Sequence, residues 1–230
     1  AISEMKKICA ANPDDIESRK GLAEIYFAYN NLEDALELVS GVYKSNPNES
    51  NWAKQFVSHI LEENPKHYLS YYLLAFIFMD ERDYKKTVEV YKKLIEMSPV
   101  EIPKVMSVLE DFKEKSGDLL LYSASLRKDT GDIDDAIKLF DKLFTQDPSF
   151  GDVIVAHINE ILKKNVNMGE AHLLAHRVFT HQKKYKEALE AIRHAREVIP
   201  DDEAIILKEG QTYYEMGDAE QAIKLYNKLL

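Results

Sequence analysis

Three histidines lie close together in the second half of the chain, and histidine is the side chain most often used for metal binding and for proton transfer near neutral pH. His172 and His176 are four residues apart, which places both on one face of a helix, and His181 follows five residues later. A zinc site needs three or four ligands held in place by further hydrogen bonds, and the surrounding sequence supplies neither. We therefore predict packed or solvated histidines, with no metal and no cofactor.

Pairs of neighbouring carboxylates could also do chemistry, because two acids can divide the roles of acid and base or hold a cation together. All three pairs fall at expected helix starts or turns, where negative charge suits the helix dipole, so we predict a capping role. The pairs are Asp14 with Asp15, Asp134 with Asp135, and Asp201 with Asp202. The sequence holds no Gly-rich phosphate loop, HExxH pair, Cys–His cluster or nucleophile elbow. We therefore predict no catalytic residue and no enzyme.

The net charge of -10 argues against nucleic acid as a partner, because binding to phosphates needs a basic face. One basic stretch runs from Arg177 to Arg196, but Glu187, Glu190 and Glu197 are interleaved in and beside it. That mixture is typical of a solvated helix face, and a site for an acidic partner peptide is the alternative. Cys9 is the only cysteine, so the chain cannot form an internal disulfide bond.

The segment 68–99 is the clearest structural element, and its pattern predicts two antiparallel helices. Tyr68 to Met79 is apolar on almost every face, yet it is shorter than the ~20 residues that span a bilayer, so we predict no direct membrane insertion. A polar turn follows at 80–83, and apolar residues then recur every three or four positions, as in an amphipathic helix. Pro99 lies just past the expected end of this second helix, where proline cannot continue it.

The same layout recurs along the chain with small residues such as Ala124, Ala136 and Gly210 where two helices would cross, and large ones around them. The predicted hairpins lie at about 16–47, 68–99, 117–148, 169–200 and 203–230. This pattern resembles the tetratricopeptide repeat, a 34-residue helix-turn-helix with a closing proline. The resemblance implies an all-α fold, a right-handed helical-hairpin repeat solenoid or superhelix, forming one domain over residues 1–230. The hairpin at 169–200 departs from the pattern, with His176 at a usually small position and one extra residue expected in its turn.

Lone helices are predicted between most hairpins, at about 2–12, 51–63, 102–115 and 152–164. The closing prolines of the hairpins, at positions 47, 99, 148 and 200, are consequently 52, 49 and 52 residues apart, where ordinary tandem repeats would give 34. Consecutive helices joined by short links are antiparallel. Three helices per unit therefore reverse successive hairpins, and each lone helix is predicted to occupy a helix position in a two-layer stack.

The resemblance also implies a partner-binding groove on the first helices of the hairpins. Carried over by position, the candidate partner-binding residues are Lys20, Glu24, Phe27, Leu121, Ser125, Lys128, Leu173, Arg177, His181, Gln211 and Tyr214. One subfamily clamps a C-terminal carboxylate with Lys, Asn and Arg, but the matching positions here hold Gly21, Glu24 and Leu73, so this function is not supported. Tyr72, Phe76 and Met79 could form an apolar groove or be covered by the lone helices.

We therefore predict a protein–protein interaction scaffold that docks a partner peptide or protein on the surface of the solenoid. The alternative is a regulatory or targeting module fused to an enzyme or a membrane-associated assembly, and an enzyme built on the solenoid itself is the third reading. The sequence lacks an initiator Met and a closing proline for its last repeat, so we expect a fragment of a longer protein. Leu225, Leu229 and Leu230 on an uncapped last helix are expected to expose apolar surface, through which two copies could pair.

Overall fold

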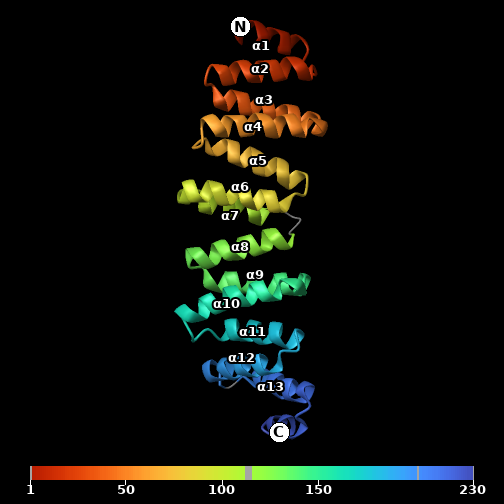
Figure 1. Cartoon of the computed structure of the whole chain (residues 1–230), viewed down its shortest axis with the longest axis vertical. Coiled ribbons are helices and arrows are strands. Elements are labelled where there is room, and N and C mark those ends of the chain that lie inside the picture. Colours follow the sequence, from red (N-terminus) through yellow and green to blue (C-terminus); the bar gives the residue numbers. More distant parts are fainter. Residues whose placement is uncertain (1, 112–115, 201, 230) are drawn as a thin grey trace. The chain divides into compact units, whose positions relative to one another are not determined.

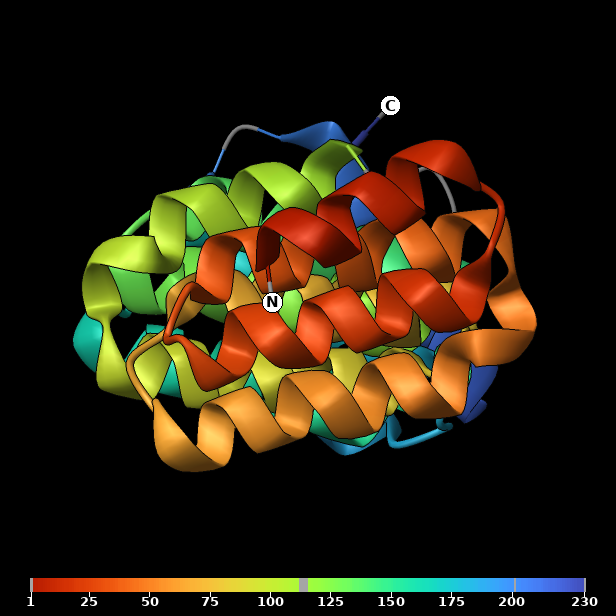
Figure 2. The same ribbon diagram turned by 90° about the horizontal axis from the view of Figure 1, so that it is seen from above.

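The described residues, 2–111, 116–200 and 202–229 of a computed structural model, form fourteen α-helices and three short 3-10 helices, with no strand among them. The chain is an all-α helical-repeat solenoid, as the sequence predicts. It divides into two compact units, Ala1–Asp111 and Phe112–Leu230. Within each unit the helices follow one another in chain order, with their axes across the stack (Figures 1 and 2). That the whole chain forms one domain stays a prediction.

The first unit holds two hairpins and three lone helices. Its elements are α1 (Ile2–Ala11), α2 (Ile16–Ala28), α3 (Leu32–Ser45), η1 (Pro47–Glu49), α4 (Ser50–Glu63), α5 (Tyr68–Asp80), α6 (Tyr84–Met97), η2 (Pro99–Glu101) and α7 (Ile102–Asp111). The hairpins are α2 with α3 and α5 with α6. Residues 112–115 of the predicted lone helix at 102–115 lie outside the described residues.

The second unit holds three hairpins and one lone helix. Its elements are α8 (Gly117–Thr130), α9 (Ile133–Gln146), η3 (Pro148–Phe150), α10 (Gly151–Lys164), α11 (Gly169–His181), α12 (Tyr185–Val198), α13 (Glu203–Met216) and α14 (Ala219–Tyr226). The lone helix is α10, and α12 leads to α13 without a helix between them.

Every hairpin turn uses one residue in the left-handed region followed by a tight backbone hydrogen bond. In the α8–α9 turn Gly131 has φ +91°, and the amide of Asp132 donates to the carbonyl of Arg127 over 2.9 Å. In the α11–α12 turn Lys183 takes this place with φ +57°, and the amide of Lys184 donates to the carbonyl of Phe179 over 2.9 Å. The turn at 182–184 thus holds one residue more than the turn at 131–132, as expected, and because α11 is one residue shorter than α8 the hairpin keeps its length.

The prolines at positions 47, 99 and 148 each begin a 3-10 helix that runs directly into a lone helix. Proline suits this place because its fixed φ fits the first turn of a helix and its missing N–H would be unbonded there. Pro200 differs from them in its position, because the next helix after it is α13 of the last hairpin rather than a lone helix. The proline that closes one hairpin is therefore also the start of the next lone helix.

The lone helices α4 and α10 pack between the hairpins on either side of them, as predicted. Each buries one apolar face: Ala53, Val57 and Ile60 in α4, and Ile154, Ile158 and Ile161 in α10. In the second unit the side chains of α8 meet those of α10, and the side chains of α9 and α13 meet those of α11. Alternate helices therefore share a layer within this unit, which confirms that the inserted helix puts α8 and α11 in different layers.

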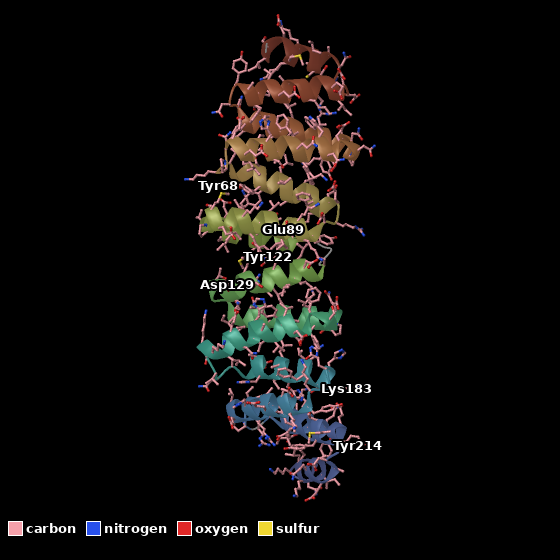
Figure 3. The ribbon with its side chains drawn as sticks, in the orientation of Figure 1. Tyr68, Glu89, Tyr122, Asp129, Lys183 and Tyr214 are labelled. Atoms are coloured by element: carbon pink, nitrogen blue, oxygen red, sulfur yellow. The ribbon has the colours of Figure 1, made fainter. Side chains whose placement is uncertain are left out.

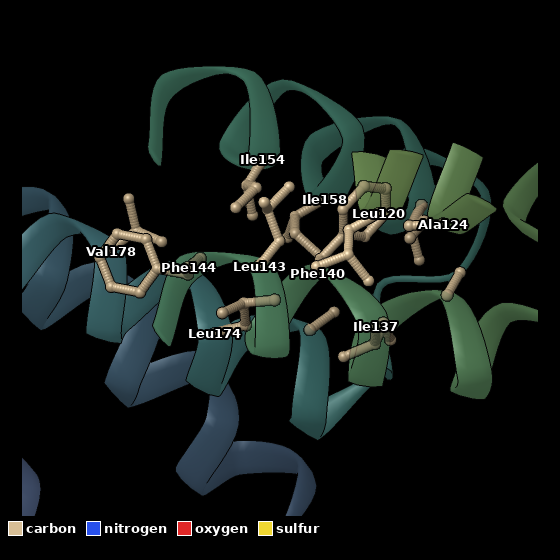
Figure 4. Packing of buried hydrophobic residues seen from close by; sticks show 14 of the residues in the cluster. Leu120, Ala124, Ile137, Phe140, Leu143, Phe144, Ile154, Ile158, Leu174 and Val178 are labelled. Carbon is tan, nitrogen blue, oxygen red and sulfur yellow. The ribbon is translucent and has the colours of Figure 1, made fainter. Parts of the chain in front are cut away.

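The core of the second unit lies between these two layers (Figure 4). Helix α9 supplies Ala136, Ile137, Phe140, Leu143 and Phe144, which recur at three- and four-residue steps, and all of them are buried. At the last hairpin Gly210 is needed for space, since a Cβ there would lie 2.5 Å from the Tyr226 ring. The small-and-large pattern of the sequence thus reflects close helix crossings.

Candidate partner-binding groove

A groove of about 1020 Å³ runs over helix α11 between α9 and α13 of the second unit. Its volume lies at the upper end of the ~300–1,000 Å³ range of ligand pockets in proteins. The lining residues are Asp134, Ile137, Lys138, Asp141, Glu170, Leu173, Leu174, His176, Arg177, Thr180, His181, Lys208, Gln211 and Thr212. Helices α10 and α12 lie in the other layer, so the three lining helices are each separated by an antiparallel neighbour and run parallel to one another.

Four of the residues predicted to bind a partner come together here, namely Leu173, Arg177, His181 and Gln211. Leu173 is half-buried and packs against the apolar cluster of the last hairpins. Gln211 is exposed, and its amide Nε2 donates to Glu215 Oε1 over 3.0 Å. The wall residues from α9 were not predicted, because the family pattern points only to the first helices of the hairpins. On α13, Gln211 was predicted, whereas Lys208 and Thr212 were not.

The wall on the α9 side is held by Arg177. Its guanidinium pairs with the carboxylate of Asp141, and its Nη2 donates to Thr145 Oγ1 over 2.7 Å. The guanidinium also lies 5.3 Å from the centre of the Phe144 ring, and the His181 ring stands perpendicular to that ring with 5.5 Å between the two ring centres. Arg177 remains 43% exposed, so this pair is a surface interaction that a ligand can reach.

The floor of the groove contains a buried histidine. His176 Nε2 lies 2.9 Å from Thr212 Oγ1, and the hydroxyl of Thr212 donates to the carbonyl of Lys208 over 2.8 Å. The same ring nitrogen also lies 3.3 Å from Thr180 Oγ1, so it has two hydroxyl neighbours within the chain. Burial, with a smaller contribution from the positive charge of Lys208, lowers the pKa of His176 to about 4. The ring is therefore neutral at pH 7 and links α11 to α13.

The neighbouring His172 has different partners, so the two histidines do not converge on one point. Its Nε2 lies 2.9 Å from the carbonyl oxygen of Val166, and its ring lies 5.2 Å from that of His194 on α12. Burial lowers the pKa of the His172 imidazole. Across the described ranges, no three His, Cys, Asp or Glu side chains are grouped as a metal site would need.

A second set of predicted residues, on α8, is covered by the lone helix α10. Lys128 Nζ pairs with Glu160 and donates to His157 Nδ1 over 3.1 Å, and its side chain is only 11% exposed. Ser125 Oγ donates to the carbonyl of Leu121 over 2.8 Å and lies 3.4 Å from His157 Nε2. Burial and then the charge of Lys128 lower the pKa of His157. Leu121 packs against the apolar core of the second unit, so all three predicted residues of α8 are already engaged within the chain.

The predicted residues of α2 are also largely covered, in this case by η1 and α4 of the first unit. Lys20 Nζ lies 2.6 Å from Glu49 Oε2 and 5.4 Å from the centre of the Trp52 ring. Phe27 packs edge-on against Phe56 with 5.8 Å between the ring centres. Glu24, the third predicted residue on this helix, is exposed.

The candidate groove residues of α5, Tyr72, Phe76 and Met79, divide between the two readings left open by the sequence. Met79 is buried, and the hydroxyl of Tyr72 donates to Glu101 Oε2 over 2.7 Å beneath Lys104, whose Nζ lies 4.1 Å from the ring centre. Phe76 is 42% exposed. Covering by neighbouring elements therefore applies to two of the three residues.

The last predicted residue and the last helix differ from expectation. Tyr214 is 68% exposed and does not line the groove, although it shares helix α13 with Gln211 (Figure 3). Leu225 is buried against the last apolar cluster, so its expected exposure is wrong; the exposed apolar side chain of α14 is Ile223. Leu229 is half-buried, and Leu230 lies outside the described residues.

The carboxylate pairs lie at helix starts, as expected. Asp202 Oδ1 accepts from the amide of Ala204 over 2.8 Å, and Asp134 and Asp135 lie in the first turn of α9. Asp15 is at the N-cap position of α2, although its carboxylate bonds to the hydroxyl of Ser18 rather than to a helix amide. Asp201 lies outside the described residues.

Sequence models of the tetratricopeptide repeat match most of the chain. One covers residues 1–55 and 179–230, a second covers 68–101 and a third covers 118–149. The chain belongs to the tetratricopeptide repeat family, whose members bind protein or peptide partners, and it is a protein-interaction scaffold. The longest unmatched stretch, 150–178, contains the lone helix α10 and most of the groove helix α11. Five of the fourteen groove residues lie in this unmatched stretch, and the other nine lie in matched segments.

Solved structures of repeat proteins resemble the chain only distantly. One, described as YrrB, a TPR protein with an unusual peptide-binding site, is 16% identical, with 99% of this chain and 91% of that chain covered and a TM-score of 0.35. Yeast Tom70 is 14% identical, with 99% and 53% covered and a TM-score of 0.41. MamA AMB-1 is also 14% identical, with 67% and 92% covered and a TM-score of 0.36. No curated protein sequence matches significantly.

Among the described helices, none combines the length and the apolar character needed to cross a bilayer.

Proposed function

We propose that this chain is a non-catalytic scaffold that binds a segment of a partner protein in the groove formed by α9, α11 and α13. The observation that carries the proposal is the groove itself, which is large, reachable from solvent and lined by both apolar and polar side chains. Grooves of this kind, with an apolar floor and a few polar groups that fix orientation, are typical of ligand sites. Leu173, Arg177, His181 and Gln211 are the proposed partner contacts.

The proposal omits the other predicted contacts. Lys20, Phe27, Leu121, Ser125 and Lys128 already bond to or pack against residues of neighbouring elements, so binding through them would first require those contacts to break. Glu24 and Tyr214 are exposed, but neither lines the groove. They are therefore suitable positions for matched controls.

The groove chemistry favours binding over catalysis. The group in the groove whose pKa is displaced most, His176, is buried in the floor and bonded to Thr212. A general base must reach the proton that it removes from a substrate, and this ring nitrogen is already committed to a hydrogen bond within the protein. We therefore assign His176 a role in joining α11 to α13.

Site-specific photo-crosslinking in a lysate of the source cell tests the proposed face. A photoreactive benzoylphenylalanine replaces Gln211 in one sample, Tyr214 in a second and Glu24 in a third. We expect a specific crosslinked partner from position 211 and weaker or no crosslinking from 214 and 24. A partner that crosslinks from position 24 but not from 211 would refute the groove and favour the first unit.

A blocking substitution provides the second half of the test. Gln211→Trp fills the groove from an exposed position, while Glu24→Trp adds the same side chain elsewhere, and both variants should keep the native circular dichroism. We expect Gln211→Trp to abolish recovery of the crosslinked partner in a pull-down, and Glu24→Trp to leave recovery unchanged. Equal recovery by the two variants would count against the proposal.

Pairing of two copies through the last helix stays a prediction. The apolar side chain available for it is Ile223, 57% exposed on α14, rather than the buried Leu225. Association through this helix would not use the groove residues.

A further inference from the structure

The charges along the groove are unevenly distributed. Because α9, α11 and α13 run parallel, their N-terminal ends lie at the same end of the groove. Asp134 lies in the first turn of α9 and Glu170 in the first turn of α11, and both carboxylates are exposed and line the groove. One end of the groove is therefore acidic on two neighbouring helices.

The remaining charges of the groove differ in whether they are already paired. Arg177 pairs with Asp141, and Lys138 Nζ lies 2.8 Å from Asp135 Oδ1 just outside the groove. Lys208, in the second turn of α13, is exposed. In the part of the chain that the structure describes, Asp134, Glu170 and Lys208 have no ion-pair partner. Two carboxylates and one ammonium group are thus left to meet charges on a ligand.

An apolar surface lies between these charges. Leu173 is one helical turn from Glu170 on α11 and is only half-buried, while Ile137 and Leu174 beside it are buried in the floor. A ligand side chain that covers Leu173 would remove apolar area from water, which favours binding. The Arg177–Asp141 pair bounds the groove beyond Leu173 on the α9 side.

We propose that the segment bound in this groove is zwitterionic. A Lys or Arg side chain lies against Asp134 and Glu170, an apolar side chain covers Leu173, and an Asp or Glu side chain pairs with Lys208. This inference rests on the proposed function, because it names the partner chemistry of the same groove. Exposed ion pairs add little affinity, but like charges brought together at an interface are unfavourable, so the arrangement acts mainly on specificity.

Selection from a library of random nonapeptides, displayed on phage and captured by the intact chain, tests the proposal. We expect the enriched peptides to carry a basic and an acidic residue on either side of an apolar one. These peptides should bind the Gln211→Trp variant at least tenfold more weakly than they bind the native chain. Lys208→Glu should weaken them about fivefold, the upper effect of one exposed ion pair. Replacing the acidic residue of the peptide by lysine should restore binding to that variant.

The acidic end has its own matched variant. The double substitution Asp134→Lys and Glu170→Lys changes two exposed positions. It should weaken the binding of peptides selected by the native chain and strengthen the binding of peptides whose basic residue is replaced by glutamate. The zwitterionic pattern would be refuted, and the groove kept, by peptides that fail to bind Gln211→Trp but whose affinity changes less than twofold with every charge reversal in the chain. Peptides that bind Gln211→Trp as well as the native chain, or a selection with no enrichment, would refute both the pattern and the groove.

Discussion

Helices α8 and α11 are both first helices of a hairpin in the second unit, yet they present the same repeat positions differently. On α8 the predicted contacts Ser125 and Lys128 bond to His157 and Glu160 of α10. On α11 the predicted contacts Arg177 and His181 line an open groove. The comparison teaches that the neighbouring helix in the same layer decides whether a repeat position is covered or open for binding. The place of the residue in the repeat does not decide it.

The same contrast appears in two histidines. His157, on the lone helix, takes part in the closure over α8, whereas His176, on α11, lies at the bottom of the groove. Both rings have a lowered pKa, and burial is the larger cause for each, followed by a nearby lysine. The two histidines thus share the causes of a lowered pKa and differ in what lies above them.

Truncation of the core should separate the two regions most strongly. Ile158→Ala, at a fully buried position of the covering helix α10, should lower the free energy of unfolding by about 2–5 kcal/mol because it leaves a cavity. Leu173→Ala, at the half-buried position in the groove, should cost less than about 2 kcal/mol, since solvent can occupy the space. Urea unfolding with unchanged m-values measures both. Equal losses would show that the groove floor is as closed as the α8–α10 contact.

The stability of the groove floor should depend on pH. The pKa of His176 is about 4 in the folded chain and about 6.5 in the unfolded chain, so the unfolded state binds more protons between these values. Stability from this residue is complete above pH 6.5 and is lost as pH falls toward 4. Between pH 7 and pH 5 the loss from His176 is about 2 kcal/mol.

The variant His176→Gln isolates this contribution from those of His157 and His172, whose pKa values are lowered in the same direction. Its free energy of unfolding should fall less between pH 7 and pH 5 than that of the native chain. If the free energy of unfolding of His176→Gln depends on pH as steeply as that of the native chain, protonation of His176 does not destabilise the fold.

The smallest predicted effect concerns the turns of the two hairpins. Lys183→Gly should stabilise the α11–α12 turn by about 0.5–1 kcal/mol, because glycine adopts a positive φ without the clash of a Cβ. Gly131→Lys should destabilise the α8–α9 turn by a similar amount. Thermal unfolding of the two single variants checks the sign. Two shifts of the same sign would show that side-chain contacts, and not φ, decide these turns.

Much of the fold could be predicted because the determining signals are local. The three- and four-residue apolar spacing, the turn residues and the prolines locate the helices within a few residues of their observed ends. The spacing of the prolines also predicted that inserted helices reverse successive hairpins, and the contacts of α8 with α10 and of α11 with α13 confirm it within the second unit.

The site could be predicted only in part because its walls come from different repeats. Asp134 and Lys138 belong to the second helix of one hairpin, and Lys208 to the first helix of another, so no single repeat contains the groove. The covering of Lys20 and Lys128 depends on the long-range contacts with Glu49 and Glu160. One signal was present in the sequence: hairpins separated by a lone helix change layer, whereas α11 and α13, with only α12 between them, do not.

The lone helix α10 also shows that the layer of a helix depends on whether an odd or an even number of helices precedes it. Inserting or deleting one helix turns over every later helix of the stack, so that side chains of one layer exchange with those of the other. Adding a helix pair leaves them in place. A chain that duplicates three-helix segments therefore sends copies of one sequence position to opposite surfaces, and one ancestral pattern can evolve there under two separate sets of constraints.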